Sequence, residues 1–229
     1  MNRAQLLAML ALQSTLNSAV NPDWRAAGCP FLRAAFVESG EAMEHYGWKW
    51  WKKQVPDTAQ FGVELIDILH FYLSHTLVVI RGDLDDAADR ILQVTTDERR
   101  GHVRGVMFDD QWYSFADMDT LAKVELLGGL AVARRESWLL LYSLFDDIGM
   151  SFNMAFDIYV GKNILNMFRQ ANGYNEGTYI KDWFGKEDNQ VMSALLIELA
   201  GVDPDDLPMC LEAALAEEYA KVTNAASYA

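Results

Sequence analysis

Cysteine is scarce in this chain: Cys29 and Cys210 are the only two among its 229 residues. Two cysteines are too few for a disulfide framework or for a zinc site built from thiolates. Basic residues are also outnumbered, with 19 lysines and arginines against 33 aspartates and glutamates and a formal net charge of −14. A surface this acidic repels phosphate backbones and anionic lipids, so we expect the protein to bind neither nucleic acid nor a membrane.

Long hydrophobic runs are missing as well, since no stretch approaches the roughly 20 apolar residues of a membrane span. A short apolar stretch, residues 6–12, lies near the N-terminus, but polar residues interrupt it from Gln13 onward and make it a poor signal peptide. The lack of a membrane span and of a good signal peptide predicts a soluble protein. The low number of cysteines predicts a reduced compartment, the cytoplasm (or the host cytoplasm for a viral protein).

Proline is absent from residues 57–203, and all five prolines lie toward the two ends of the chain. So long a stretch without proline, and without strand-like alternation between turn signals, is typical of helices joined by short loops. We therefore predict an all-α helical bundle that forms a single domain over residues 1–229. Residues 94–120 have the least regular pattern and indicate an exposed excursion. The predicted helices cover residues 3–20, 30–53, 57–80, 83–96, 115–132, 136–149, 151–171, 187–200 and 208–222.

Two pairs of carboxylates stand out against this background. Glu38 and Glu41 are three positions apart, and Glu64 and Asp67 repeat that spacing, which places each pair on one face of its helix. Pro56 lies between the pairs and favours a break there, so we predict a helical hairpin that brings the four carboxylates together. A pair at this spacing is, by itself, most often an ordinary solvated helix face.

The surroundings of the second pair favour a metal site instead. Residues 63–73 are apolar on almost every side, which is typical of a core helix. Ionised carboxylates there cost several kcal/mol unless they are paired or bind a cation. An all-oxygen set selects Mg²⁺, with Mn²⁺ as a plausible substitute, and Mg²⁺ usually shares its ligands with substrate phosphates. Glu44 continues the first series as a fifth candidate, or more simply as a surface charge.

Groups that suit phosphates follow in the second half of the chain. Lys162, Asn166 and Arg169 form one helical stripe, and a turn-rich loop with Tyr174 and Lys181 comes after it. Arginine forks, lysine ammonium groups and tyrosine hydroxyls all bind phosphate oxygens. The plainer alternative is a solvated basic face.

Four further residues suggest a pocket for a base. Gln13 and Asn17 share one face of an otherwise apolar helix, and a carboxamide matches the donors and acceptors of a uracil-like ring. Trp51 belongs to a cluster of three tryptophans and either packs on a base or serves the core. His70 follows Asp67 by one turn and either contacts a ligand or is a satisfied core histidine.

In this order, these blocks resemble the dimeric all-α dUTPase family, a relative of the wider all-α nucleotide pyrophosphohydrolases. The resemblance covers residues 12–75 and 150–192 and leaves residues 82–137 unassigned. The blocks are residues 12–17, Glu38-Ser-Gly-Glu41 with 48–52, residues 64–71, and residues 161–189 with Asn172-Gly173-Tyr174, Trp183 and Glu187-Asp188-Asn189.

The resemblance implies a Mg²⁺-dependent homodimer that hydrolyses dUTP, and usually dUDP, to dUMP and so limits uracil incorporation into DNA. It implies metal ligation by Glu38, Glu41, Glu64 and Asp67, with Glu38 or Glu41 acting on the attacking water. Phosphates would be bound by Lys162, Asn166, Arg169, Tyr174 and Lys181. The uracil and sugar would be bound by Gln13, Asn17, Trp51, His70 and Phe71.

Two alternatives to this function stay open at the level of the sequence. A flipped carboxamide accommodates cytosine, so a pyrophosphohydrolase acting on dCTP or on a broader set of nucleotides fits the same residues. A non-catalytic helical dimer that binds a protein partner is the more distant alternative. The apolar segments 121–132 and 138–144 serve either as a dimer interface or as core.

Overall fold

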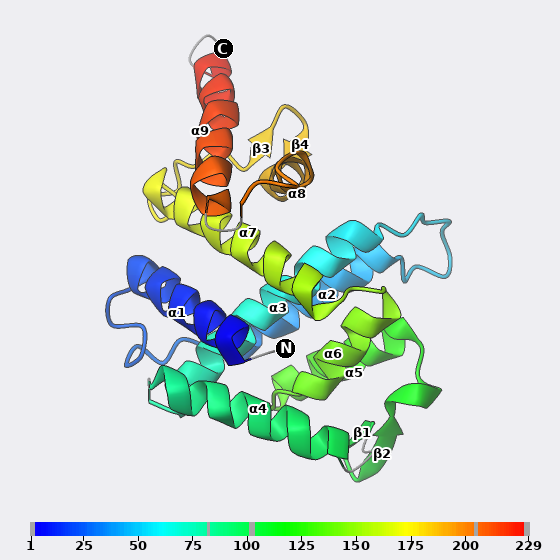
Figure 1. The fold of residues 1–229 in the computed structure, drawn as a ribbon. Coiled ribbons are helices and arrows are strands. Elements are labelled where there is room, and N and C mark those ends of the chain that lie inside the picture. The colour runs from blue at the N-terminus through cyan, green and yellow to red at the C-terminus, as the bar shows by residue number, and fades with distance from the viewer. Residues whose placement is uncertain (1–2, 82, 101–103, 204–205, 227–229) are drawn as a thin grey trace.

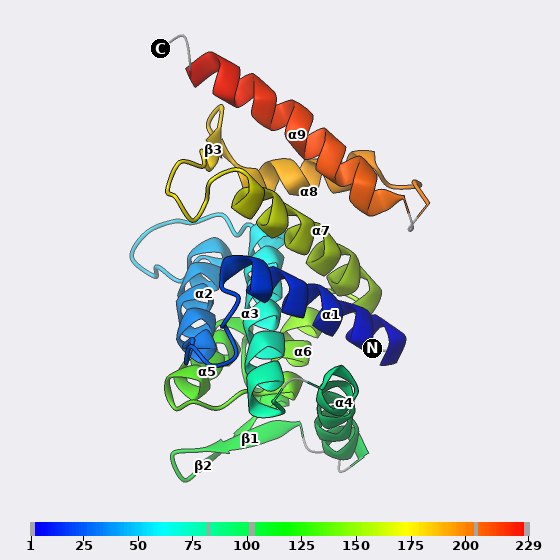
Figure 2. The same ribbon diagram turned by 90° about the vertical axis from the view of Figure 1, so that its left-hand side faces the viewer.

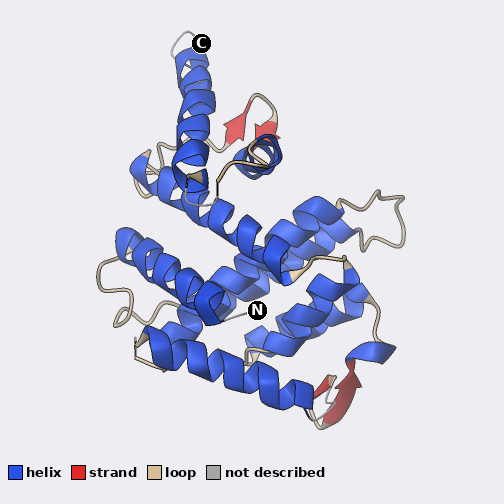
Figure 3. Cartoon of the chain, in the orientation of Figure 1, coloured by secondary structure: helices blue, strands red, loops and turns tan. Residues whose placement is uncertain are grey.

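The structure is a computed structural model that describes residues 3–81, 83–100, 104–203 and 206–226. Figures 1 and 3 show that the structure is mostly helical, with loops and only short strands between the helices. The predicted all-α class is therefore confirmed. In chain order the elements are α1 (Arg3–Val20), α2 (Phe31–Tyr46), α3 (Thr58–Val79), α4 (Leu84–Arg100), β1 (Gly105–Phe108), β2 (Gln111–Ser114), the 3₁₀ turn η1 (Phe115–Asp117), α5 (Thr120–Val132), α6 (Trp138–Asp147), α7 (Phe152–Ala171), β3 (Asp182–Trp183), β4 (Lys186–Glu187), α8 (Asp188–Glu198) and α9 (Leu207–Ala226).

Helix α2 is shorter than the predicted 30–53. It ends at Tyr46 because Gly47 adopts a left-handed conformation, with φ +89°, and its N–H bonds to the carbonyl of Met43. Such a glycine is a common helix terminator. Residues 47–57, with their tryptophans, therefore form a loop between α2 and α3.

The excursion predicted at 94–120 is in part regular structure. Helix α4 runs on to Arg100, and β1 and β2 pair as an antiparallel hairpin that the sequence analysis missed. Asp109 and Asp110 make its turn with φ values of +50° and +59°, the left-handed pair that a two-residue hairpin turn requires. Helix α5 then begins at Thr120 rather than 115, because the Asp119 side chain caps it by accepting from the N–H of Ala122.

Helices α2 and α3 form the predicted hairpin, side by side and joined by the 47–57 loop (Figure 2). Asp57 begins α3 by accepting from the N–H of Gln60, and its own N–H bonds to the carbonyl of His45 at the end of α2. Helix α3 is long and apolar enough to pass for a membrane span, which the sequence analysis did not anticipate. Because 72% of that stretch is buried inside the protein, we interpret α3 as a core helix.

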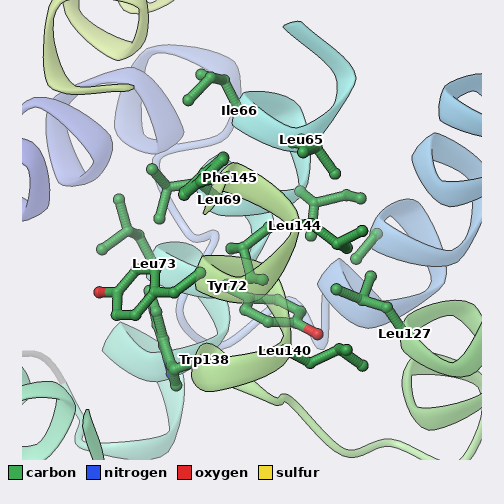
Figure 4. Packing of buried hydrophobic residues seen from close by; sticks show 14 of the residues in the cluster. Leu65, Ile66, Leu69, Tyr72, Leu73, Leu127, Trp138, Leu140, Leu144 and Phe145 are labelled. Carbon is green, nitrogen blue, oxygen red and sulfur yellow. The ribbon is translucent and has the colours of Figure 1, made fainter. Parts of the chain in front are cut away.

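The main core surrounds α3. Tyr72 and Trp138 meet edge to face, with ring centroids 5.5 Å apart. Helices α5 and α6 contribute their apolar faces to this cluster, so the segments 121–132 and 138–144 are largely core. Figure 4 shows part of the packing, with Leu65, Ile66, Leu69, Leu73, Leu127, Leu140, Leu144 and Phe145 labelled.

A second hydrophobic cluster lies toward the C-terminus. The far half of α7 contributes Leu165 and Phe168, which pack with side chains of β3, α8 and α9. The near half of α7 contributes Ala155 and Tyr159 to the main core. Helix α7 thus connects the two clusters and lies between α1 and α3 on one side and α8 and α9 on the other (Figure 2).

Candidate active site

Three carboxylates meet where α2 packs on α3. Glu38 and Glu41 come from α2 and Glu64 from α3, and each offers an oxygen such that all three oxygens lie within 4.8 Å of one another. Glu64 is only 4% exposed, Glu38 is half-buried and Glu41 is exposed. The hairpin therefore brings together three of the four carboxylates that the sequence analysis singled out.

The cluster is electrostatically strained in the absence of a cation. Burial, followed by repulsion from Asp67 and Glu41, raises the pKa of Glu38 to about 7. Burial and the charge of Asp67 raise the pKa of Glu64 to about 8. Like charges at this separation disfavour joint ionisation, and a bound divalent cation removes that conflict. One exposed, one half-buried and one buried carboxylate form a donor set that suits Mg²⁺, because this ion keeps part of its water shell.

Asp67 lies one turn beyond Glu64 and is bound to a lysine. Its Oδ2 is 2.8 Å from Nζ of Lys162, which is 1% exposed and also donates to Oδ1 of Asn189 at 2.9 Å. An ammonium has three N–H donors, so one donor of Lys162 stays available beside these two bonds. Lys162 thus lies behind the carboxylates and tethers α7 to α3.

Arg169 is held by residues of α8. Its Nε and Nη2 donate to the two oxygens of Asp188, at 2.8 and 2.7 Å, and Nη2 also donates to Asn189. Nη1 donates to Oδ1 of Asn166. Burial alone would raise the pKa of Asp188, but its bonds to Arg169 outweigh burial and the pKa is lowered. These contacts leave one Nη1 hydrogen of Arg169 for a ligand, since a guanidinium has five N–H donors.

A pocket of about 380 Å³ opens between α1, α3 and α7. Glu38 and Asp67 lie in its wall together with Arg169 and Tyr174. Two carboxylates and a guanidinium, a group that binds phosphates well, therefore line the same space. The other lining residues are Gln13, Leu16, Asn17, Val20, Asn21, Trp24, Cys29, Phe31, His70, Phe71, Asn166, Gln170 and Asn175.

The polar side chains of α1 and α3 in this wall form one hydrogen-bonded network. Gln13 donates through Nε2 to Oδ1 of Asn17, and its Oε1 is 2.7 Å from Nδ1 of His70. The imidazole stacks on the ring of Tyr159, with centroids 4.1 Å apart, and burial lowers the pKa of His70 to about 3. His70 is therefore neutral, and its buried Nε2 has no hydrogen-bond partner in the part of the chain that the structure describes.

The family of the chain follows from a comparison with known families. A model of the dUTPase family matches residues 5–174, about three quarters of the sequence. The chain belongs to the dUTPase family. It is therefore a dUTP diphosphatase, as the resemblance implied. No individual curated protein matches the sequence.

Glu41, Glu64 and Lys162 do not line the pocket, but they belong to the carboxylate cluster or contact Asp67. Three other candidate residues lie away from both the pocket wall and the cluster. Trp51 is 56% exposed in the loop after α2, where its ring meets those of Trp48 and Trp50 edge-on. The Lys181 side chain is 49% exposed and pairs with Glu187 at 3.5 Å. Glu44, the residue left open as site or surface, binds Trp48 and Lys49 outside the carboxylate cluster and is a surface charge.

The sequence analysis missed several groups of the candidate site. Asp188 and Asn189 entered it only as part of the resemblance, although they hold Arg169 and Lys162. Both lie beyond the residues that the family model matches. The one available signal was an acid and an amide at the start of a helix, a pattern that equally predicts a helix cap. Tyr159 and Ser74 gave no signal, because apolar neighbours predict core positions for both.

Proposed function

We propose that the enzyme hydrolyses dUTP, and also dUDP, to dUMP in a Mg²⁺-dependent reaction that releases pyrophosphate or phosphate. Removing dUTP limits the incorporation of uracil into DNA. The observation that carries this proposal is the position of Glu38, which belongs both to the carboxylate cluster and to the wall of the pocket. A nucleotide in that pocket would have its phosphates within reach of the cluster.

Four carboxylates would hold the metal in this proposal. Glu38, Glu41 and Glu64 have the spacing of metal ligands, and the raised pKa values of Glu38 and Glu64 are those of buried groups that need a cation to ionise together. Asp67 joins them as a ligand when its contact to Lys162 is shared with the ion. Bound Mg²⁺ would supply charge neutralisation at the phosphates and a lower pKa for the attacking water.

The roles of the protein side chains follow from their positions. Glu41 is the most exposed carboxylate of the cluster, so Glu41 or Glu38 would orient the attacking water and accept its proton. Arg169 and Lys162 would each use their remaining donor on a phosphate oxygen, with Asn166, Tyr174 and Lys181 in support. Because their other donors are fixed by Asp188, Asp67 and Asn189, the two cations are preorganised for the charge of the transition state.

The base and sugar would occupy the opposite part of the pocket. Gln13 and Asn17 face it with carboxamides, and His70 and Phe71 lie in the same wall. For Trp51 to contact the base, the 47–57 loop would have to move from its present position. Neutral side chains in this region suit an uncharged pyrimidine.

We also propose that the active form is a homodimer in the cytoplasm. Helices α5 and α6 are committed to the core, so the interface would use other surfaces. The exposed face of α2 offers Phe36 and Val37, and the adjoining loop offers Trp50, which is 89% exposed. Sedimentation at low protein concentration tests this, and a stable monomer would contradict it.

Parallel turnover assays with five nucleotides test the substrate. We expect turnover of dUTP and dUDP with Mg²⁺, and slow turnover of dCTP, dTTP and UTP. Preference for dCTP would replace the proposed substrate within the same fold. Absence of phosphate or pyrophosphate release from every nucleotide would favour a non-catalytic dimer.

A further inference from the structure

Ser74 lies in α3, one turn beyond His70 of the pocket wall, and is completely buried. Its hydroxyl is 2.9 Å from the carbonyl oxygen of His70, one turn earlier in the same helix. The same oxygen atom is 3.0 Å from Nδ2 of Asn17. A longer contact of 3.4 Å joins it to Oδ1 of Asn17.

A serine hydroxyl has one proton, and this fixes the direction of every bond that follows. The shorter contact shows that Ser74 donates its proton to the carbonyl oxygen of His70, so the Ser74 oxygen accepts from Nδ2 of Asn17. Oδ1 of Asn17 must then face Gln13 and accept from its Nε2, at 3.0 Å.

The same direction continues through Gln13 to the imidazole. With Nε2 of Gln13 turned toward Asn17, its Oε1 faces Nδ1 of His70 at 2.7 Å and the hydroxyl of Tyr159 at 2.9 Å. An amide oxygen only accepts, so Nδ1 of His70 carries the proton. The neutral imidazole then has a bare Nε2, the buried atom that has no partner within the described residues.

Tyr159 does not set this direction by itself. Its hydroxyl is 2.9 Å from Oε1 of Gln13 and equally 2.9 Å from the carbonyl of Met9, so it can donate to either oxygen. If the carboxamides of Gln13 and Asn17 were both reversed, Tyr159 would donate to Met9 and stay satisfied. Only Ser74 opposes that reversal, because it would have to give up its bond to the His70 carbonyl.

We infer that Ser74 is a positioning residue that sets the polarity of the Gln13–Asn17–His70 network and thereby the pattern of donors and acceptors that the pocket offers to a base. In this state the second N–H of Gln13 and of Asn17 stay available as donors, and Nε2 of His70 stays available as an acceptor. Uracil has two carbonyl oxygens on either side of an N–H and complements that pattern. Cytosine replaces one carbonyl with an amine and the N–H with an acceptor, so it matches poorly.

This inference rests on the proposed function only for its consequence for the substrate. The protonated nitrogen of His70 can be observed in the free protein by ¹⁵N NMR, with the signals assigned by replacing the other histidines in turn. We expect the proton on Nδ1 in the wild type. The Ser74→Ala variant should move a large part of the population to the Nε2-protonated form. Thr76→Ala is the matched control, because Thr76 is buried two positions away and bonds to Glu136 instead.

The kinetic readout is the ratio of kcat/KM for dUTP to kcat/KM for dCTP. We expect Ser74→Ala to lower this ratio roughly ten-fold, because about one hydrogen bond that distinguishes uracil from cytosine is lost. Thr76→Ala should leave the ratio unchanged. Ser74→Cys fills the same position with a thiol, a much weaker donor and acceptor than a hydroxyl, and repeats the test if the alanine variant does not fold.

Two results would overturn the inference: a wild-type His70 protonated on Nε2, or folded Ser74 variants with the wild-type tautomer. Lack of any nucleotide turnover by the folded wild type would overturn the proposed function instead. The NMR spectrum would in that case still decide the role of Ser74.

Discussion

Arg169 and Asp188 form a two-point ion pair, with Nε–Oδ2 and Nη2–Oδ1 distances of 2.8 and 2.7 Å. Asp188 is completely buried and also accepts from the hydroxyl of Tyr179. The pair joins α7, which lies within the residues matched by the family model, to α8, which lies beyond them. Helix α8 thus stabilises the Arg169 guanidinium, which lies in the pocket wall.

Replacing Asp188 with asparagine should damage both stability and catalysis. The change leaves the Arg169 guanidinium buried without its counter-charge, a loss of about 3–5 kcal/mol in the free energy of unfolding. We expect kcat/KM for dUTP to fall by at least ten-fold in protein that remains folded. Thermal unfolding and steady-state kinetics measure the two effects. Glu212→Gln removes an exposed acid of α9 and should change neither quantity.

Replacing Glu41 with glutamine should nearly abolish turnover while helix content stays the same. Glu41 is exposed, so the change in the free energy of unfolding should stay within about 0.5 kcal/mol. Its role as metal ligand or base predicts a loss of at least about 100-fold in kcat. Glu44→Gln is the matched control one turn later on α2, outside the cluster. A Glu41→Gln variant near the wild-type rate would exclude this carboxylate from the chemistry.

The stability of the metal-free protein should fall as the pH rises from about 5 to above 8. Glu38 and Glu64 have pKa values of about 7 and about 8 in the folded protein, above the ordinary value of 4.5. Over that range the folded state binds more protons than the unfolded chain, so raising the pH favours unfolding. Melting temperatures in a chelating buffer measure the trend, with the Glu64→Gln variant as reference.

Mg²⁺ should reverse this trend, because it binds the ionised carboxylates of the folded state. We expect its stabilising effect to be larger at pH 8 than at pH 6, since protons compete with the ion at the lower pH. A wild-type melting temperature that rises with pH relative to Glu64→Gln in the absence of metal would contradict the burial argument.

The two hydrophobic clusters should unfold together. We propose that residues 1–229 form one domain, because α7 contributes to both clusters and the Arg169–Asp188 pair connects them. Calorimetry should show one transition with equal calorimetric and van't Hoff enthalpies. Two separate transitions would divide the chain into two units.

Most of the helical architecture was predictable from the sequence, and the reasons are local. The absence of proline from residues 57–203 predicted the helical class. The carboxylate spacing, with Pro56 between the two pairs, predicted the α2–α3 hairpin, since both signals depend on neighbours within a few residues. The end of α2 was misplaced because the left-handed Gly47 competes with the helix-like pattern of the tryptophans that follow. The β1–β2 hairpin was missed because Asp109 and Asp110 are not the asparagine–glycine pair that usually marks such a turn.

The candidate site was predictable only in its residue types. The sequence placed Asp67 with the other acids, but it contains no information that Lys162, 95 positions later, occupies the space beside Asp67. The same holds for Asp188 and Arg169, which meet across two helices. The direction of the hydrogen bonds is harder still to predict from the sequence. The role of Ser74 depends on where a single hydroxyl proton points within a network of side chains from α1 and α3.

The central claim is that carboxylates of the α2–α3 hairpin bind Mg²⁺ for the hydrolysis of dUTP. The most direct test is the release of pyrophosphate from dUTP by the wild type and by Glu64→Gln, with Mg²⁺ and with chelator. We predict turnover only by the wild type and only with Mg²⁺. Equal rates with and without the ion, or a Glu64→Gln variant as active as the wild type, would contradict it.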